Sequence, residues 1–380
     1  MLMLIKNAHV ISPGVELKNA AIEMENNFIK HVYKEGESLP SGEKEFDAGE
    51  KMVVPGFIDV HIHAGMGYEA TTDDPKAVPA IAGEKLREGV TSFCPTTLTL
   101  SKEQLAVSLK HIEKYRLHPT ASRVIGTHLE GPFINPKCAG AQNPTYLRAP
   151  NFEEIQALND ISRVSIVSYA PELEGSVEFT KDLRDAGICS SCGHTNATMA
   201  QFMACKKAGL HRLTHFCNQM TKLHHREIGM VGTGLYDDDV YIEMICDKIH
   251  LCPDMIKLIF KLKPIDKILL ITDAMEATGL PDGNYQLGGL DVVVADGAAR
   301  LASNGALAGS ILQYNTALKN VYELTGLPLK ELIKTTSLNQ AQNLGLSKLG
   351  KVEDGFRADI TVLDQKFNVH AVFMDGVQKI

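Results

Sequence analysis

Residues 53–63 read VVPGFIDVHIH, an apolar run of strand length that ends in two histidines. Val53 to Val60 predicts a buried strand, because it is short, apolar and bounded by polar residues. Asp74 then offers an N-cap with Pro75 at the first helical position, and Gly89 ends the predicted helix. This strand followed by a helix is the first unit of a series, and the series decides the fold class.

The same alternation repeats along the middle of the chain. Ser101 and Gln104 have capping-box spacing and predict a helix through Tyr115, and further helices are expected at 199–208 and 254–262. About seven or eight strand–helix units over roughly 300 residues favour a closed (β/α)₈ barrel of the TIM type. No Gly-x-Gly-x-x-Gly follows the first strand, which argues against a dinucleotide-binding fold. The later strands are expected at 123–129, 164–167, 188–190, 212–215, 240–245 and 268–272.

The two ends of the chain have a different sequence pattern, in which strands are predicted without helices between them. Short apolar strands separated by Asn, Gly and Pro are predicted at 4–11, 20–24, 359–363 and 369–374. We therefore expect an α/β protein in two parts. Residues 1–53 and 350–380 form a small β-sandwich domain, and residues 54–349 form the (β/α)₈ catalytic barrel.

Composition excludes several classes of function. The 380 residues carry 38 Lys and Arg against 46 Asp and Glu, and a net charge of −8 leaves no basic surplus for nucleic acid. No apolar run approaches the roughly 18 residues that cross a membrane, and the start is too short for a signal peptide. We therefore expect a cytoplasmic protein with no membrane partner. The eight cysteines are scattered, which argues against a disulfide framework.

Polar residues with catalytic potential follow the predicted strands. In a barrel the C-terminal ends of the strands meet at one rim, where active sites are built. The spacing of His61 and His63 points both imidazoles to one side of an extended segment. Imidazole and carboxylate together suit Zn²⁺, Fe²⁺ or Mn²⁺. The candidates at this rim are His61, His63, Glu130, His194, His215 and Asp273.

Each of these residues also has an ordinary structural explanation. Glu130 could pair with a cation, and His194 or His215 could be a hydrogen-bonded core histidine. Asp273 could cap a helix. Burying one carboxylate and two imidazoles without a shared partner would be costly, so we favour one metal site that keeps a position open for water. Asp273 beside that water could take up a proton and later deliver it.

Two further motifs are less specific. Cys189 and Cys192 have the spacing of a zinc or redox pair, but a second pair is missing and packing in the core is the favoured explanation. Arg226, after two histidines, could lie on a solvated face. Arginine near a catalytic rim also suits a phosphate, which it binds with two parallel hydrogen bonds.

Five motifs together resemble a known family. PGFIDVHIH at 55–63 is similar to the first-strand signature of the amidohydrolase superfamily. Within it, the chain resembles the N-acetylglucosamine-6-phosphate deacetylases, and the resemblance runs in order along residues 1–380. It implies metal-dependent hydrolysis of N-acetyl-D-glucosamine 6-phosphate to D-glucosamine 6-phosphate and acetate, in amino-sugar catabolism or cell-wall sugar recycling. The other four motifs are HLEGPF at 128–133, GHT at 193–195, THFCNQM at 214–220 and TDAM at 272–275.

The resemblance also implies roles for individual residues. Glu130, His194 and His215 would bind a metal, and Asp273 would be the general base and acid. His61 and His63 would allow a second metal, so that each chain binds one or two divalent ions. A neighbouring subunit would complete the phosphate pocket, which implies a homodimer. The implied substrate-binding residues are Gln142 (where many members carry His), Asn218, Gln219, Arg226, His250 and Leu307, the last in a loop that could act as a lid.

Two other functions stay open. A dihydroorotase-like enzyme or a deaminase would share the barrel, but members that bridge two metals with a carboxylated lysine need Lys where Glu130 stands. A non-catalytic binding protein would be expected to have lost metal ligands or Asp273, and all of them are present.

Overall fold

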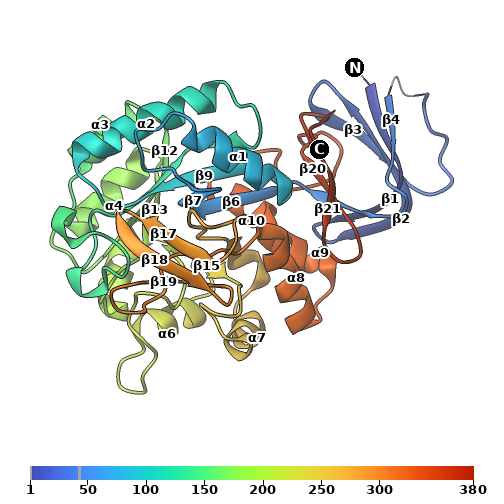
Figure 1. The fold of residues 1–380 in the computed structure, drawn as a ribbon. Helices are drawn as coiled ribbons and strands as arrows, with labels where there is room; N and C mark the ends of the chain where they lie inside the picture. Colours follow the sequence, from blue (N-terminus) through green and yellow to red (C-terminus); the bar gives the residue numbers. More distant parts are fainter. Residues whose placement is uncertain (1, 42–43) are drawn as a thin grey trace.

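The computed structural model describes residues 2–41 and 44–380, and Figure 1 shows two parts. The ends of the chain lie together in one sheet beside a larger body of strands and helices. Within the described residues this terminal sheet has eight strands in the order β22-β21-β20-β5-β1-β2-β3, with β4 paired to β1. The strands are β1 (Leu2–Ser12), β2 (Val15–Glu25), β3 (Phe28–Tyr33), β4 (Lys44–Asp47), β5 (Met52–Pro55), β20 (Ile360–Leu363), β21 (Val369–Met374) and β22 (Val377–Gln378).

The strand expected over 53–60 is two strands, which corrects the prediction. β5 pairs with β1 and β20 in the terminal sheet, whereas β6 (Phe57–Ile62) belongs to the body. Gly56 lies between them, and a Cβ there would be 2.4 Å from the Thr91 side chain. Only glycine fits this crossing, so we propose Gly56 as the boundary between the two parts.

The body is a parallel barrel, as predicted. Among the described residues its eight strands follow the order β6-β9-β11-β12-β13-β14-β15-β16, and β10 (Arg123–Val124) adds to β9. The Asp273 N–H donates to the His61 carbonyl at 2.9 Å and joins the last strand to the first. The remaining strands are β9 (Val90–Thr97), β11 (Thr127–Glu130), β12 (Val164–Tyr169), β13 (Cys189–Cys192), β14 (Arg212–Leu213), β15 (Tyr241–Ile245) and β16 (Ile268–Ile271).

Helices follow most of the barrel strands and surround them in Figure 1. The capping box of Ser101 and Gln104 is confirmed at the start of α2. α1 begins at Ala77 rather than Pro75, because Asp74 accepts the Lys76 N–H and forms a turn first. The helices are α1 (Ala77–Arg87), α2 (Lys102–Leu117), α3 (Phe152–Asn159), α4 (Ser176–Asp185), α5 (Met199–Ala208), α6 (Gly229–Tyr236), α7 (Pro253–Leu262), α8 (Tyr314–Thr325), α9 (Leu329–Leu332) and α10 (Leu338–Asn343).

Two features were absent from the prediction. β9 is rich in Thr and contains Pro95, a composition that argues against a central strand, yet all eight of its residues are buried. An antiparallel sheet also follows β16 and has its own apolar core around Val292 and Leu301. Its strands are β17 (Gly283–Leu287), β18 (Leu290–Ala295) and β19 (Ala298–Leu301), and a short pair is formed by β7 (Ala64–Gly65) and β8 (Tyr68–Glu69).

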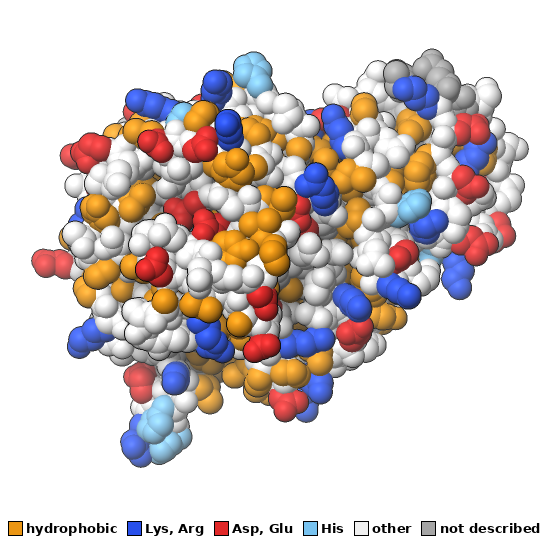
Figure 2. Space-filling model, in the orientation of Figure 1, with side chains coloured by type: hydrophobic (Ala, Val, Ile, Leu, Met, Phe, Trp, Pro, Cys, Tyr) orange, Lys and Arg blue, Asp and Glu red, His pale blue; other side chains and the backbone are white. Residues whose placement is uncertain are grey.

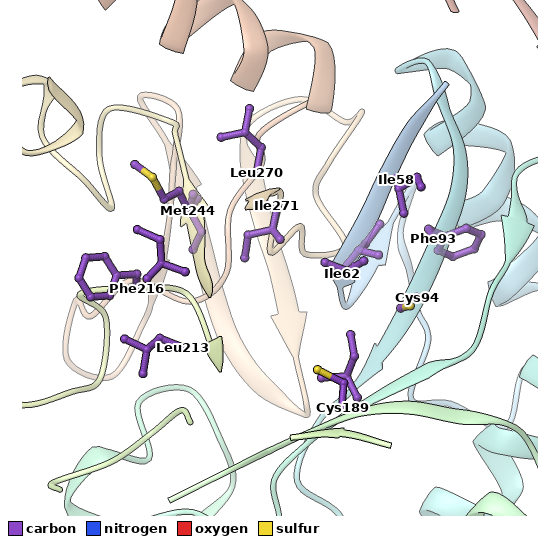
Figure 3. Close-up of a cluster of buried hydrophobic side chains, with 14 of the residues drawn as sticks. Ile58, Ile62, Phe93, Cys94, Cys189, Leu213, Phe216, Met244, Leu270 and Ile271 are labelled. Atoms are coloured by element: carbon purple, nitrogen blue, oxygen red, sulfur yellow. The ribbon is translucent and has the colours of Figure 1, made fainter. Parts of the chain in front are cut away.

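Apolar side chains fill the barrel wall. Figure 3 shows Ile58 and Ile62 of β6 near Phe93 of β9, with Cys189 of β13 in the same cluster. Cys189 and Cys192 are both buried in this core, as expected for packing residues. No helix in residues 2–41 and 44–380 has both the length and the apolar character needed to cross a membrane.

Candidate active site

Six predicted residues meet at the C-terminal rim of the barrel, and we call them the rim cluster. Glu130 lies at its centre: its Oε1 is 3.0 Å from His215 Nε2 and 3.3 Å from His194 Nε2. Its Oε2 is 3.2 Å from His63 Nε2. All six side chains are buried. The rim cluster consists of His61, His63, Glu130, His194, His215 and Asp273.

The rim cluster divides into two sets of potential ligands. Glu130, His194 and His215 form one set, and His61, His63 and Asp273 form the other. In the second set, Asp273 Oδ1 is 3.2 Å from His63 Nε2 and 3.4 Å from His61 Nε2. Glu130 touches both sets, because its Oε1 also lies 3.4 Å from His61 Nε2.

Hydrogen bonds to Nδ1 turn three of the imidazoles toward the centre. His63 Nδ1 lies 3.1 Å from the Thr96 carbonyl, and His194 Nδ1 lies 2.7 Å from the Cys138 carbonyl. His61 Nδ1 is 2.9 Å from a carboxylate oxygen of Glu243. Each Nδ1 therefore donates its proton to the neighbouring oxygen, and each Nε2 faces the rim cluster, where its lone pair would bind a cation once any proton held there is lost.

The backbone bends sharply just after the strands that carry three residues of the rim cluster. His194, His215 and Asp273 have φ of 47°, 29° and 52°, in the left-handed region that residues other than glycine rarely adopt. Such strain persists where the surrounding structure demands it, and it concentrates at functional sites. Each of the three residues follows a different strand, and the left-handed bend at each of them directs its side chain into the rim cluster.

The electrostatics favour positive charge at the centre. Burial raises the pKa of Glu130 and of Asp273, but nearby imidazoles, His61 foremost, lower both overall. Burial lowers the pKa of His63, yet hydrogen bonds to Asp273 and Glu130 raise it to about 10. Within the described residues, no Lys or Arg pairs with either carboxylate.

These residues fit a divalent metal ion. His194 Nε2 and His215 Nε2 face one another at 3.0 Å beside Glu130, an arrangement that a shared cation would satisfy. Nδ1 of His215 is buried without a hydrogen-bond partner within the described residues. Two carboxylates and four imidazoles form a donor set suited to borderline metals. The rim cluster therefore indicates a divalent metal site.

A pocket of about 220 Å³ opens over the rim cluster. Five of the six predicted substrate-binding residues line it, together with Leu98 and Leu287 as apolar wall. The antiparallel sheet that the prediction missed supplies Leu287. The five residues are Gln142, Asn218, Gln219, His250 and Leu307.

Gln142 contacts the rim cluster directly. Its Oε1 accepts the Thr99 N–H at 2.7 Å, so its amide group must point toward Glu130. Nε2 donates to Glu130 Oε2 at 2.5 Å. Gln142 is buried, and it holds the central carboxylate as well as bordering the pocket.

His250 is oriented by an aspartate. Its Nδ1 lies 2.7 Å from Asp247 Oδ2, while Asp247 Oδ1 accepts two main-chain N–H groups at 2.8 Å. Both side chains are largely buried. Nε2 of His250 is left to face the pocket, so this imidazole is held ready for a polar group of a ligand.

Arg226 does not line the pocket of its own chain. It lies in the segment 221–228 between β14 and α6, which projects from the body in Figure 1. Figure 2 shows basic and histidine side chains at the tip of this projection. Arg226 Nη1 lies 2.7 Å from His225 Nε2, and the side chain is exposed.

Sequence reasoning missed Glu243 and Arg212. Both are fully buried, and Arg212 Nε donates to Glu243 Oε1 at 2.8 Å below the rim cluster. The signal was present, because Glu243 interrupts the apolar strand that was predicted at 240–245. A carboxylate buried in a central strand needs a cation or several donors.

A parallel barrel with paired histidines at the end of its first strand, and with three further potential metal ligands and an aspartate at the same rim, is typical of amidohydrolases. Residues 52–379 match the amidohydrolase family, and the chain belongs to that family.

Three proteins within this family are similar to the chain over most of its length. The chain is 37% identical over 344 residues to N-acetylgalactosamine-6-phosphate deacetylase of Escherichia coli O157:H7, covering 90% of each chain. It is 33% identical to N-acetylglucosamine-6-phosphate deacetylase of Bacillus subtilis, covering 97% of this chain and 94% of that protein. An aspartate-to-alanine mutant of the Mycobacterium smegmatis enzyme, solved with N-acetyl-D-glucosamine 6-phosphate, has a TM-score of 0.93 at 30% identity and covers 99% of each chain.

Proposed function

We propose that this protein hydrolyses the acetamide of N-acetyl-D-glucosamine 6-phosphate and releases acetate and D-glucosamine 6-phosphate. The observation that carries the proposal is the rim cluster beneath one pocket, in a chain 33% identical to the Bacillus subtilis deacetylase over nearly its whole length. The reaction would belong to amino-sugar catabolism or cell-wall sugar recycling.

Glu130, His194 and His215 would hold one divalent cation, and His61 with His63 would hold a second that shares Glu130. Each chain would thus bind one or two ions, drawn from Zn²⁺, Fe²⁺ and Mn²⁺. When bound, such a cation polarises a carbonyl and lowers the pKa of water.

Asp273 would move the protons. It takes a proton from the water whose oxygen bonds to the amide carbon, and it gives that proton to the nitrogen as the C–N bond breaks. Its position supports both steps, because its carboxylate borders the pocket and also meets His61 and His63. One carboxylate can serve both transfers, since it regains its starting state with each turnover.

The side chains of the pocket walls would bind the substrate and determine its specificity. The side chains of Asn218, Gln219 and His250 offer hydrogen bonds to sugar hydroxyls or phosphate, and Gln142 supports Glu130. Leu307 would close over the sugar as part of a lid and exclude water.

A neighbouring copy would complete the phosphate pocket. Arg226 does not line the pocket of its own chain, and the segment 221–228 projects from the body, so its proposed phosphate contact requires a homodimer in which this segment reaches the partner subunit. Arg226→Ala should raise KM for the phosphorylated sugar while the dimer, measured by sedimentation, persists. A cytoplasmic location stays a prediction, which cell fractionation would test.

The proposal is tested by acetate release from the purified full-length protein. N-Acetylglucosamine 6-phosphate, N-acetylgalactosamine 6-phosphate and unphosphorylated N-acetylglucosamine should be compared, each with and without a chelator. We expect chelator-sensitive release that is fastest with the first sugar. Preference for the galactosamine epimer would change the substrate and keep the class, whereas equal rates without phosphate would contradict the phosphate contacts. No release from any of them would overturn the proposal.

A further inference from the structure

We propose that Glu243 is the positioning residue that makes His61 a metal ligand, and that it thereby decides whether the His61–His63 half of the rim cluster binds a divalent cation. This inference rests on the proposed function only in requiring a cation at the rim. Its test measures metal binding and uses no sugar.

Glu243 is a fully buried carboxylate in the middle of β15. Its Oε1 accepts hydrogen bonds from Nε of Arg212, at 2.8 Å, and from Nη2 of the same guanidinium. Its Oε2 accepts the main-chain N–H of His215 at 3.0 Å and lies 2.9 Å from His61 Nδ1. Arg212 is itself fixed, because its Nη1 donates to Asn343 Oδ1 at 2.7 Å. The carboxylate therefore has a single orientation.

This geometry determines which nitrogen of His61 carries the proton. A carboxylate that pairs with a guanidinium only accepts hydrogen bonds, so the contact requires a proton on Nδ1. The lone pair of His61 then lies on Nε2. That atom is 3.3 Å from His63 Nε2 and 3.4 Å from Glu130 Oε1, so it faces the centre of the rim cluster.

Glu243 differs from the groups that orient the other ligands. His63 and His194 donate to the main-chain carbonyls of Thr96 and Cys138, which no substitution removes. His61 depends on a side chain. A single replacement can therefore alter one ligand and leave the orientation of these two unchanged.

Glu243→Gln is the informative variant, because it keeps the shape and replaces one oxygen by an NH₂ group. The amide oxygen should stay with Arg212, whose nitrogens only donate. The NH₂ group then faces His61 Nδ1 and pushes the proton to Nε2, which removes the lone pair from the rim cluster. The same NH₂ group opposes the His215 N–H, so some loss of stability is expected as well.

The control is Ser168→Ala. Ser168 is buried, and its hydroxyl bonds to Nε2 of His128, whose ring centroid is 4.6 Å from that of His61. This variant also removes a buried hydrogen-bond partner close to the rim cluster. It leaves the contact between Glu243 and His61 intact, so it separates loss of stability from loss of orientation.

The experiment is a Zn²⁺ titration of metal-stripped full-length protein against a chromophoric chelator. We expect two equivalents in the wild type and in Ser168→Ala. In Glu243→Gln the second equivalent should bind about 10- to 100-fold more weakly. In a His61→Asn background, which lacks that ligand already, Glu243→Gln should have no further effect on the remaining equivalent.

Nitrogen NMR of the histidine rings supplies a measurement that does not depend on how Glu243→Gln folds. The His61 signals, identified by their loss in His61→Asn, should show the proton on Nδ1 in the wild-type protein. A proton on Nε2 would overturn the inference. So would two equivalents at wild-type affinity in Glu243→Gln, an equal loss in Ser168→Ala, or a single wild-type equivalent that His61→Asn leaves unchanged. Two bound equivalents without deacetylase activity would refute the proposed function and leave this inference standing.

Discussion

Two buried charged clusters share the first and last strands of the barrel, β6 and β16, and they differ in how their carboxylates are balanced. The rim cluster contains His61 on β6 and Asp273 just after β16. A second cluster, which we call the seam cluster, is formed by one residue of β6, one residue directly after β16 and two residues at the end of α1. Lys85 Nζ is 2.7 Å from Glu88 Oε2 and 3.5 Å from Asp59 Oδ2. The seam cluster consists of Asp59, Lys85, Glu88 and Thr272, whose hydroxyl donates to Asp59 at 2.6 Å.

The difference between the clusters is the source of positive charge. Lys85 supplies a basic side chain inside the seam cluster, and burial raises the pKa of Glu88 to about 7 even though Lys85 opposes that shift. In the rim cluster the basic groups that face the two carboxylates are all imidazoles, among the described residues. The seam cluster thus contains its own basic side chain and links β6 to the end of β16, whereas the rim cluster is arranged to receive a cation.

The strongest test of this contrast is Asp273→Asn. Loss of the carboxylate that we propose to transfer protons should lower kcat by about 10³-fold while the bound metal stays near its wild-type level. Acetate release and metal analysis of the same sample measure both. The matched change in the seam cluster, Asp59→Asn, should affect stability more than kcat. Loss of metal in parallel with activity would show that Asp273 is chiefly a ligand.

Lys85→Met tests the seam cluster. Without its cation, the cluster buries Asp59 and Glu88 unpaired, and we expect the free energy of unfolding to fall by about 3–5 kcal/mol. Urea denaturation measures this change. Protein that remains folded should keep its metal and its kcat. Unaltered stability would mean that the carboxyl groups take up protons at little cost, and the contrast between the two clusters would fail.

Asp247→Asn changes the residue that orients His250 in the pocket wall, outside both clusters, and extends the contrast between the clusters to substrate binding. The change weakens the charged hydrogen bond that orients His250, so KM should rise about tenfold with little change in kcat. Steady-state kinetics with the phosphorylated sugar separates these constants. A fall in kcat alone would place His250 in the chemistry rather than in binding.

Arg123→Gln has the smallest expected effect on stability. Arg123 donates to Asp359 Oδ2 at 2.8 Å and to Asp375 Oδ2 at 2.9 Å, and these bonds join the barrel to the terminal sheet. Its side chain is 17% exposed, so water weakens the pairs relative to the seam cluster. We expect a loss of about 1–2 kcal/mol in the free energy of unfolding. A loss equal to that of Lys85→Met would contradict the dependence on burial.

The same contact predicts a pH dependence. Partial burial raises the pKa of Asp375, but Arg357 and Arg123 lower it overall. A carboxyl group with a lowered folded pKa stabilises the protein above its unfolded value of about 3.9, and this contribution is lost as the pH falls through the folded pKa. Denaturation between pH 6 and about pH 3 should therefore show a steeper acid loss in the wild type than in Arg123→Gln.

The barrel could be predicted because its strands and helices differ in period and are separated by clear start and stop residues. The rim cluster could be predicted because its members follow the strands. β9 was not predicted, because its threonines and Pro95 differ from the apolar composition of a typical buried strand. Hydroxyl groups on this strand bond to the neighbouring strand instead: the Thr96 hydroxyl accepts the Ile62 N–H at 2.9 Å.

Glu243 and Gln142 show what sequence spacing cannot supply. Glu243 stands 182 residues from His61, and its contact depends on the barrel closing. Gln142 was expected to meet the sugar and borders the pocket, and its amide also holds Glu130 because the Thr99 N–H fixes its orientation. Both contacts are set by tertiary packing, so no local pattern in the chain could predict them.

The pairing of β5 with β20 has a consequence for how the chain is made. Val53 pairs with Val362, so the terminal sheet cannot finish until almost all of the chain has left the ribosome. The Asp273 N–H reaches the His61 carbonyl across a shorter but still long span, so the barrel cannot close until β16 has been made. Contacts of such sequence separation form slowly, and partly made barrels expose apolar strands. The nascent chain should therefore depend on chaperones until its last strands arrive.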